Sequence, residues 1–150
     1  MITTEYPLHH IGYLTKDIAI TARDWQQRLG YRIESAVIED ACQTASVQFL
    51  RQPRAAYWLE CVAPIGTDSR LAGALAKGIT LHHLCYEVNV LEQALRQLRE
   101  QGCFVVHEPT NATAFPGRRI AWLMDRHGCL IEFLEAGTPP LSLKHLVTSL

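Results

Sequence analysis

Four side chains of the kinds that bind metal ions recur at matched positions in this 150-residue chain. They are two histidines, His10 and His83, which are 73 residues apart, and two glutamates, Glu60 and Glu132, which are 72 residues apart. Two neutral imidazoles and two carboxylates make an N2O2 ligand set that suits Mn, Fe, Co, Ni or Zn. Such a set leaves positions for water or a substrate, as a catalytic metal requires. The residue types therefore predict one bound divalent metal ion.

Each glutamate lies in the middle of an apolar segment, Glu60 in WLECV and Glu132 in LIEFL. Burying a carboxylate in such a segment is costly unless it is paired or binds a metal. A lone glutamate in a strand more often faces solvent, and a lone histidine at a strand start is more often a surface or core residue. The repetition of both residue types in step favours the metal site over these readings.

Each candidate histidine is the second residue of a His-His pair within the motif L-H-H-x-x-Y, at residues 8–13 and 81–86. We select the second histidine because the strand register that begins there runs into apolar residues. Side chains alternate faces along a strand. His9 and His82 are therefore expected on the opposite face, towards solvent or a subunit contact.

The elements that would position these side chains repeat with them. After each L-H-H-x-x-Y strand, apolar residues recur at intervals of three and four, which is typical of a helix with one apolar face. Each helix is expected to end at a glycine, Gly30 or Gly102, because glycine favours the left-handed position after a helix. Beyond each glycine we expect three strands, at 31–37, 43–50 and 57–62 in the first copy and at 103–107, 119–124 and 129–134 in the second.

The repeat predicts an α+β fold of two tandem βαβββ modules within a single domain. Module one spans about 8–62, a linker about 63–80, module two about 81–135 and a C-terminal tail about 136–150. The linker contains a helix-like piece near 69–76. Matched strands of a pseudo-twofold protein would bring the two carboxylates together near its axis, where they would repel each other without a cation between them.

Composition excludes several other classes of protein. The formal net charge is -1 and no Lys/Arg run stands out, so neither nucleic acid nor an acidic membrane surface is an expected partner. The apolar stretches are much shorter than the roughly 20 residues of a membrane span, and the N-terminus lacks the layout of a signal peptide. The five cysteines are scattered without a C-x-x-C pair, which favours free thiols. We expect a cytoplasmic protein.

These residues resemble the vicinal oxygen chelate superfamily, which includes glyoxalase I, methylmalonyl-CoA epimerase, extradiol dioxygenases and bleomycin-binding proteins. The resemblance covers about residues 8–135, and its most specific segments are epimerase-like: LHHIGY at 8–13, LHHLCYEV at 81–88 and HGCLIEF at 127–133. It implies the glyoxalase fold, in which the two modules form a curved mixed sheet around a metal site. It also implies a homodimer.

The resemblance places the metal ligands at His10, Glu60, His83 and Glu132, and it gives Glu132 and Glu60 a catalytic role in proton transfer. The implied activity is that of a metal-dependent isomerase, epimerase or lyase that abstracts a proton next to a metal-bound carbonyl. The small-molecule substrate is expected to be of the acyl-CoA type, as in methylmalonyl-CoA epimerase. Arg118 and Arg119 end the 110–119 loop and are candidate substrate-binding residues.

Three other functions fit the same resemblance. A glyoxalase I-like lactoylglutathione lyase would use the same four ligands. An Fe(II) extradiol dioxygenase would need only two histidines and one glutamate, which leaves Glu60 without a role. A non-catalytic, bleomycin-type drug-binding protein would commonly lack the four ligands. The sequence does not choose the metal, the exact substrate or the oligomeric state.

Overall fold

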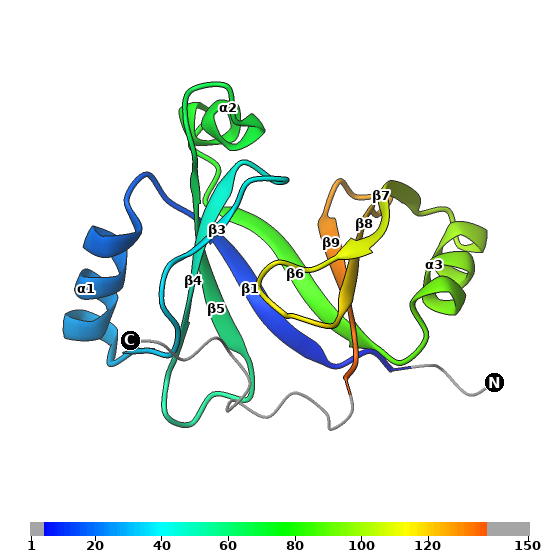
Figure 1. The fold of residues 1–150 in the computed structure, drawn as a ribbon, viewed down its shortest axis with the longest axis horizontal. Coiled ribbons are helices and arrows are strands. Elements are labelled where there is room, and N and C mark those ends of the chain that lie inside the picture. The colour runs from blue at the N-terminus through cyan, green and yellow to red at the C-terminus, as the bar shows by residue number, and fades with distance from the viewer. Residues whose placement is uncertain (1–4, 138–150) are drawn as a thin grey trace. The chain divides into compact units, whose positions relative to one another are not determined.

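The computed structural model describes residues 5–137, which form two compact units (Figure 1). The first unit comprises residues 10–82, and the second comprises residues 5–9 and 83–137. The tail predicted at 136–150 lies, from residue 138 onwards, outside the described residues. None of the helices in the described part of the chain is long and apolar enough to cross a bilayer.

The first unit contains a mixed sheet with one helix from the repeat. Its strands run in the order β2–β4–β5–β1, and β3 pairs separately with β4. Strand β1 is parallel to β5, whereas β4 is antiparallel to β5. The elements are β1 (Leu8–Leu14), α1 (Ile18–Leu29), β2 (Arg32–Ile33), β3 (Ile38–Asp40), β4 (Ala45–Arg51), β5 (Trp58–Pro64) and α2 (Arg70–Ala76).

The second unit repeats this arrangement. Its strands run in the order β6–β9–β8–β7, with β6 parallel to β9 and β8 antiparallel to β9. The elements are β6 (Leu81–Val88), α3 (Leu91–Glu100), β7 (Phe104–Asn111), β8 (Arg119–Met124) and β9 (Leu130–Glu135). The predicted α+β class and the order of two βαβββ modules are therefore confirmed.

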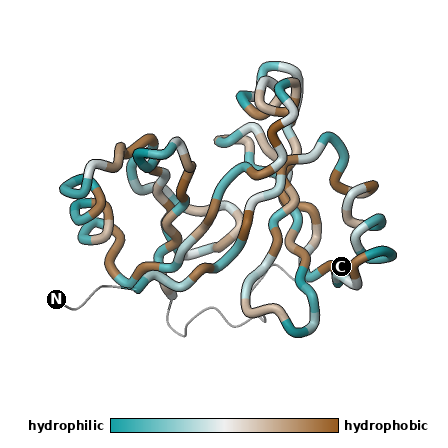
Figure 2. The backbone as a smooth tube through the Cα atoms, turned by 180° about the vertical axis from the view of Figure 1, so that it is seen from behind, coloured by the Kyte–Doolittle hydropathy of each residue, from teal (hydrophilic) through white to brown (hydrophobic). Residues whose placement is uncertain are grey.

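The repeat helices begin and end where local chemistry allows. The Asp17 side chain accepts a hydrogen bond from the Ile20 backbone N–H at the start of α1, and Gly30 ends the helix at a φ of 71°. Helix α3 ends at Glu100, two residues before the glycine predicted to end it. Figure 2 shows hydrophilic and hydrophobic residues alternating along these helices, as expected for helices with one buried face.

Each helix packs its apolar face against one face of its own sheet. In the first unit Ile18 and Ala22 of α1 lie against a core from β4 and β5 that includes Leu50 and Cys61. In the second unit the α3 residues Leu91, Ala94 and Leu95 pack against a core from β6, β8 and β9, which contains Val88, Ala121, Leu123 and Phe133. Because strand side chains alternate faces, the residues between these core positions lie on the opposite face of the sheet.

The strand predicted at 31–37 is formed only in part: β2 covers Arg32–Ile33, and the next strand, β3, begins beyond the predicted range at Ile38. The hydroxyl of Ser35, 1% exposed, accepts a hydrogen bond from the Phe49 N–H at 2.9 Å and donates one to the Ala36 carbonyl at 2.8 Å. A side chain thus replaces a backbone partner of β4, at the point between the residues of β4 that pair with β2 and those that pair with β3. In the second module the strand expected at 103–107 extends to Asn111, with two register shifts.

We predict that Ser35→Ala destabilises the fold by about 1–3 kcal/mol, because it leaves the buried Phe49 N–H without its acceptor. Urea unfolding followed by circular dichroism measures this change. Ser46→Ala, at a half-buried position of the same strand β4, is the matched control and should change the free energy of unfolding by less than about 0.5 kcal/mol. Equal effects of the two substitutions would contradict this role of Ser35.

Candidate functional site

The first unit pairs His10 of β1 with Glu60 of β5. In the parallel ladder between these strands Gly12 is directly opposite Glu60. His10, two residues before Gly12, therefore lies on the same face of the sheet as Glu60, the face away from α1. The His10 Nε2 atom lies 3.5 Å from the Glu60 Oε2 atom. The two residues are 0% and 6% exposed.

The second unit contains the equivalent pair, His83 of β6 and Glu132 of β9. These strands are also parallel neighbours, with Cys85 directly opposite Glu132. The His83 Nε2 atom lies 3.3 Å from the Glu132 Oε2 atom, and the residues are 2% and 4% exposed. The same pairing of first and last strands of a module therefore produces the same contact twice.

The chemistry of these pairs suits a metal ion. Each unit presents one imidazole nitrogen and one carboxylate oxygen at a buried position, and both contacts are longer than an ordinary hydrogen bond of about 2.7–3.2 Å. A buried carboxylate needs a positive or hydrogen-bonding partner. The four predicted ligands are thus brought together as two His–Glu pairs, one in each unit, and both pairs are possible metal ligands.

An aromatic ring accompanies each pair, and the sequence reasoning missed both rings. Phe49 of β4 is directly opposite Glu60, and its ring meets the His10 ring edge to face, with centroids 5.4 Å apart. Trp122 of β8 is directly opposite Glu132, and its ring meets the His83 ring in the same way at 4.8 Å. Each half of the candidate site is therefore a set of three side chains.

His9 and His82, the first histidines of the two His-His motifs, are less buried than His10 and His83. His9 and His82 are half-buried, and the His9 ring packs edge to face against Phe115, with centroids 5.3 Å apart.

Cys61, the cysteine next to Glu60, lacks the lowered pKa of a catalytic thiol. Burial, with a smaller contribution from the Glu60 charge, raises the pKa of Cys61 to about 12. Cys61 therefore remains a neutral thiol near neutral pH and is part of the core under α1.

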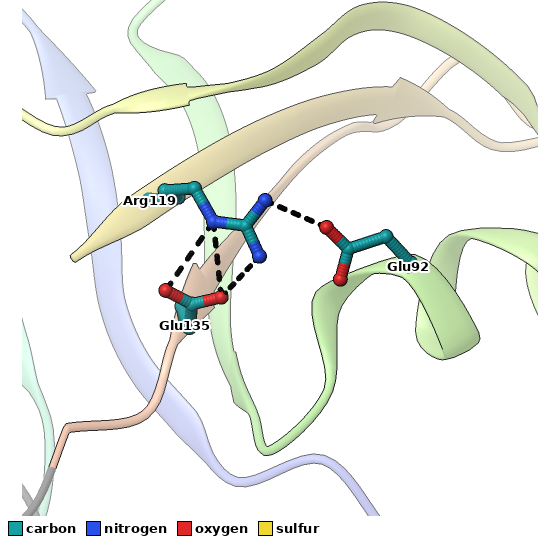
Figure 3. Close-up of polar contacts among 3 residues, drawn as sticks. All are labelled: Glu92, Arg119 and Glu135. Atoms are coloured by element: carbon teal, nitrogen blue, oxygen red, sulfur yellow. Dashed lines mark hydrogen bonds and ion pairs between the residues drawn. The ribbon is translucent and has the colours of Figure 1, made fainter.

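Arg119 holds together three elements of the second unit (Figure 3). Its Nε and Nη2 atoms donate hydrogen bonds to the Glu135 carboxylate at the end of β9, at 3.2 and 2.6 Å, and its Nη1 atom donates to Glu92 in the first turn of α3 at 2.6 Å. The hydrogen bond from Arg119 keeps the pKa of Glu92 below its usual value. The guanidinium thus connects β8 with β9 and with α3.

Arg118 lies beside Gly137. Its guanidinium occupies the space that a side chain at Gly137 would need. Burial raises the pKa of Glu87 in β6, and the charge of Arg118 opposes part of that rise. The substrate contact predicted for both arginines stays a prediction, but three nitrogen atoms of Arg119 already donate to carboxylates.

We predict that Arg119→Gln lowers stability near neutral pH and that the difference from wild type narrows in acid. A carboxyl whose pKa is lower in the folded than in the unfolded state stabilises the fold above its unfolded pKa, about 4.3 for Glu. This contribution is lost as the pH falls through the folded pKa of Glu92. Urea unfolding at neutral pH and at about pH 3.5 measures it.

Arg126→Gln is the charge-matched control, because Arg126 is also in the second unit but exposed. Its difference from wild type should be smaller near neutral pH. A stability difference for Arg119→Gln that is the same at both pH values would contradict the role of the carboxylates.

A sequence model of the Glyoxalase/Bleomycin resistance protein/Dioxygenase superfamily matches residues 9–122. An ethylmalonyl-CoA/methylmalonyl-CoA epimerase of Cereibacter sphaeroides is 28% identical over 129 residues, which cover 83% of this chain and 94% of that protein. The matches therefore run through both units, and the family match includes three of the four candidate ligands.

Solved structures of methylmalonyl-CoA epimerases are similar to this chain as well. The methylmalonyl-CoA epimerase from Mycobacterium tuberculosis has a TM-score of 0.79 and 27% identity, with 91% of this chain and 93% of that chain covered. A variant of Streptomyces coelicolor methylmalonyl-CoA epimerase in complex with 2-nitronate-propionyl-CoA has a TM-score of 0.78 and 23% identity, covering 91% and 98% of the two chains. The chain therefore has the fold of these epimerases.

Proposed function

Because the chain belongs to the Glyoxalase/Bleomycin resistance protein/Dioxygenase superfamily and is an enzyme of the vicinal oxygen chelate type, we propose that it is a metal-dependent epimerase. In this proposal the enzyme moves a proton at the carbon next to the carbonyl of a small acyl-CoA, of the methylmalonyl-CoA class. The observation that carries the proposal is the pair of buried His–Glu contacts at equivalent places in the two units.

We propose that His10, Glu60, His83 and Glu132 bind one divalent metal ion. Support comes from the donor types, two imidazole nitrogens and two carboxylate oxygens, and from their near-complete burial. When bound, such an ion polarises a carbonyl oxygen as a Lewis acid and so acidifies the adjacent C–H bond. The donor set suits Mn, Co, Ni, Zn or Fe, and the choice among them is left to experiment.

The two glutamates would carry the proton. One carboxylate removes it from the substrate carbon and the other returns a proton to the opposite face, which inverts the configuration there. In β1, β4 and β5 of the first unit, Glu60 is the one carboxylate on the face that carries His10. The neighbouring strand β4 has Val47 and Phe49 on this face, and neither can transfer a proton. We therefore assign the second acid–base group to Glu132.

The proposal extends to the substrate and to the assembly of the protein. The names of the similar proteins specify ethylmalonyl-CoA and methylmalonyl-CoA, which carry a carboxylate beside the thioester. Arg118 and Arg119 are our candidates for that carboxylate, and Arg119 also pairs with Glu135 and Glu92. The cytoplasmic location and the homodimer implied by the family resemblance stay predictions.

We predict one metal ion per chain and a loss of affinity of at least about a hundredfold in both Glu60→Gln and Glu132→Gln. Both substitutions should weaken the same ion because each removes one of its four ligands. Isothermal titration with Mn²⁺, Co²⁺, Ni²⁺ and Zn²⁺ measures affinity and stoichiometry. Glu87→Gln, which neutralises a half-buried carboxylate of β6 that is not one of the proposed ligands, is the control and should bind as wild type does. Two ions per chain, each lost in only one variant, would refute a shared site.

We predict that the metal-loaded enzyme exchanges the C2 proton of methylmalonyl-CoA with solvent deuterium. At a metal concentration that saturates each variant, Glu132→Gln and Glu60→Gln should reduce kcat by about 10²–10⁴-fold, because each lacks one proton-transfer group. Proton NMR in deuterium oxide follows the exchange. Absence of exchange by the loaded wild type, with intact metal binding, would reject this substrate class.

A glyoxalase I-like lyase is the second candidate. It is favoured by the carboxylate at Glu60, because the glyoxalase I pattern has a glutamate at this position whereas some epimerases carry a glutamine there. The same two carboxylates would then move a proton between adjacent carbons. Activity towards the hemithioacetal of glutathione and methylglyoxal, compared with exchange on methylmalonyl-CoA, distinguishes the two candidates.

A further inference from the structure

We propose that Phe49 and Trp122 are matched positioning residues, which hold the imidazoles of His10 and His83 in the orientation that metal binding requires. The proposal rests on the proposed function, because it assumes that the His–Glu pairs bind a metal ion. It adds two residues that are not among the proposed metal ligands and that act through the histidines.

The register of the strands gives the two aromatic residues equivalent places. In each module the aromatic residue lies on the strand that precedes and pairs with the glutamate-bearing strand. Phe49 of β4 is directly opposite Glu60, and Trp122 of β8 is directly opposite Glu132. Phe49 and Trp122 are 73 residues apart, the same spacing as the two histidines. The aromatic ring is therefore part of the repeated unit.

The ring contacts are equivalent as well. The Phe49 and His10 rings are inclined at 79°, and the Trp122 and His83 rings at 81°. Such edge-to-face contacts are directional, because the edge of one ring is attracted to the face of the other. An imidazole that rotated about its Cβ–Cγ bond would lose this contact.

The surroundings of Phe49 make the first contact rigid. Phe49 is fully buried, and its ring also meets that of Trp58, with centroids 5.4 Å apart. Trp58 is directly opposite His10 in the ladder of β1 and β5. His10 thus lies against the Phe49 ring and the Glu60 carboxylate, and Trp58 packs on the Phe49 ring. A metal ligand must be held within about 0.5 Å and 10–20° of its productive geometry, which requires this kind of support.

The decisive test separates positioning from general packing. Phe133 is the next residue after Glu132 in β9 and is as well buried as Trp122, but it lies on the α3 side of the sheet, where its ring packs against Tyr6. Phe133→Leu should destabilise the fold without changing the orientation of His83. It is the matched control for Trp122→Leu.

We predict that Trp122→Leu weakens binding of Co²⁺ by about tenfold, as loss of a residue that orients a metal ligand does, and changes the visible absorption bands of bound Co²⁺. Trp122→Phe keeps an aromatic ring and should restore most of the affinity and the wild-type spectrum. Phe133→Leu should lower the denaturation midpoint and leave both Co²⁺ measurements unchanged.

The first unit supplies an independent arm if Trp122→Leu fails to fold. Phe49→Leu should weaken Co²⁺ binding, whereas Leu50→Ala, one residue along β4 in the core under α1, should affect stability alone. A loss of affinity that is equal in the aromatic variants and their controls overturns the proposal. So does unchanged Co²⁺ binding in both aromatic variants.

The test also separates this inference from the proposed function. A wild-type protein that binds Co²⁺ but does not exchange the methylmalonyl-CoA proton rejects the epimerase activity and leaves the positioning test intact. A wild-type protein that binds no divalent ion overturns both. Loss of Co²⁺ affinity in the aromatic variants of an active wild type supports both.

Discussion

A carboxylate buried against an imidazole is the constraint on which the rest of this structure depends. Such a carboxylate is costly to remove from water, so the fold must supply its partner at a defined place. Both units do so by laying the last strand of a module parallel to its first strand, which places Glu60 beside His10 and Glu132 beside His83. A parallel neighbour requires a crossover connection, and the helices and remaining strands of each module provide it.

The strands that carry the glutamates perform two tasks on two faces. Cys61 and Phe133 point into the cores under α1 and α3, while the glutamates that precede them point to the opposite face. Because the side-chain period of a strand is two, a slip of one residue would move the core residue to the face of the candidate site and the acid to the face under the helix. Packing of the helices on the core face therefore fixes the register that places the glutamates on the other face.

The two units are related but not identical, and their differences lie outside the pairs. The strand that pairs with β4 is divided at Ser35, and β7, which pairs with β8, has two register shifts. Such irregularities are common at sheet edges, where they bend a strand and disturb its ladder. The cluster of Arg119 with Glu135 and Glu92 belongs to the second unit. The His–Glu–aromatic set is present in both units despite these differences.

The repeat, the class of fold and the residue types of the candidate site can be predicted from the sequence alone, because equal spacings and apolar periodicity are local properties of the chain. Which side chains meet depends on how the strands pair, and that is seen only in the folded structure. The chain from Phe49 to Glu60 is one residue longer than the chain from Trp122 to Glu132. Spacing therefore could not predict that each aromatic residue is directly opposite its glutamate. The division at Ser35 and the pairing of Arg119 were equally hidden, since both depend on partners that are distant in the chain.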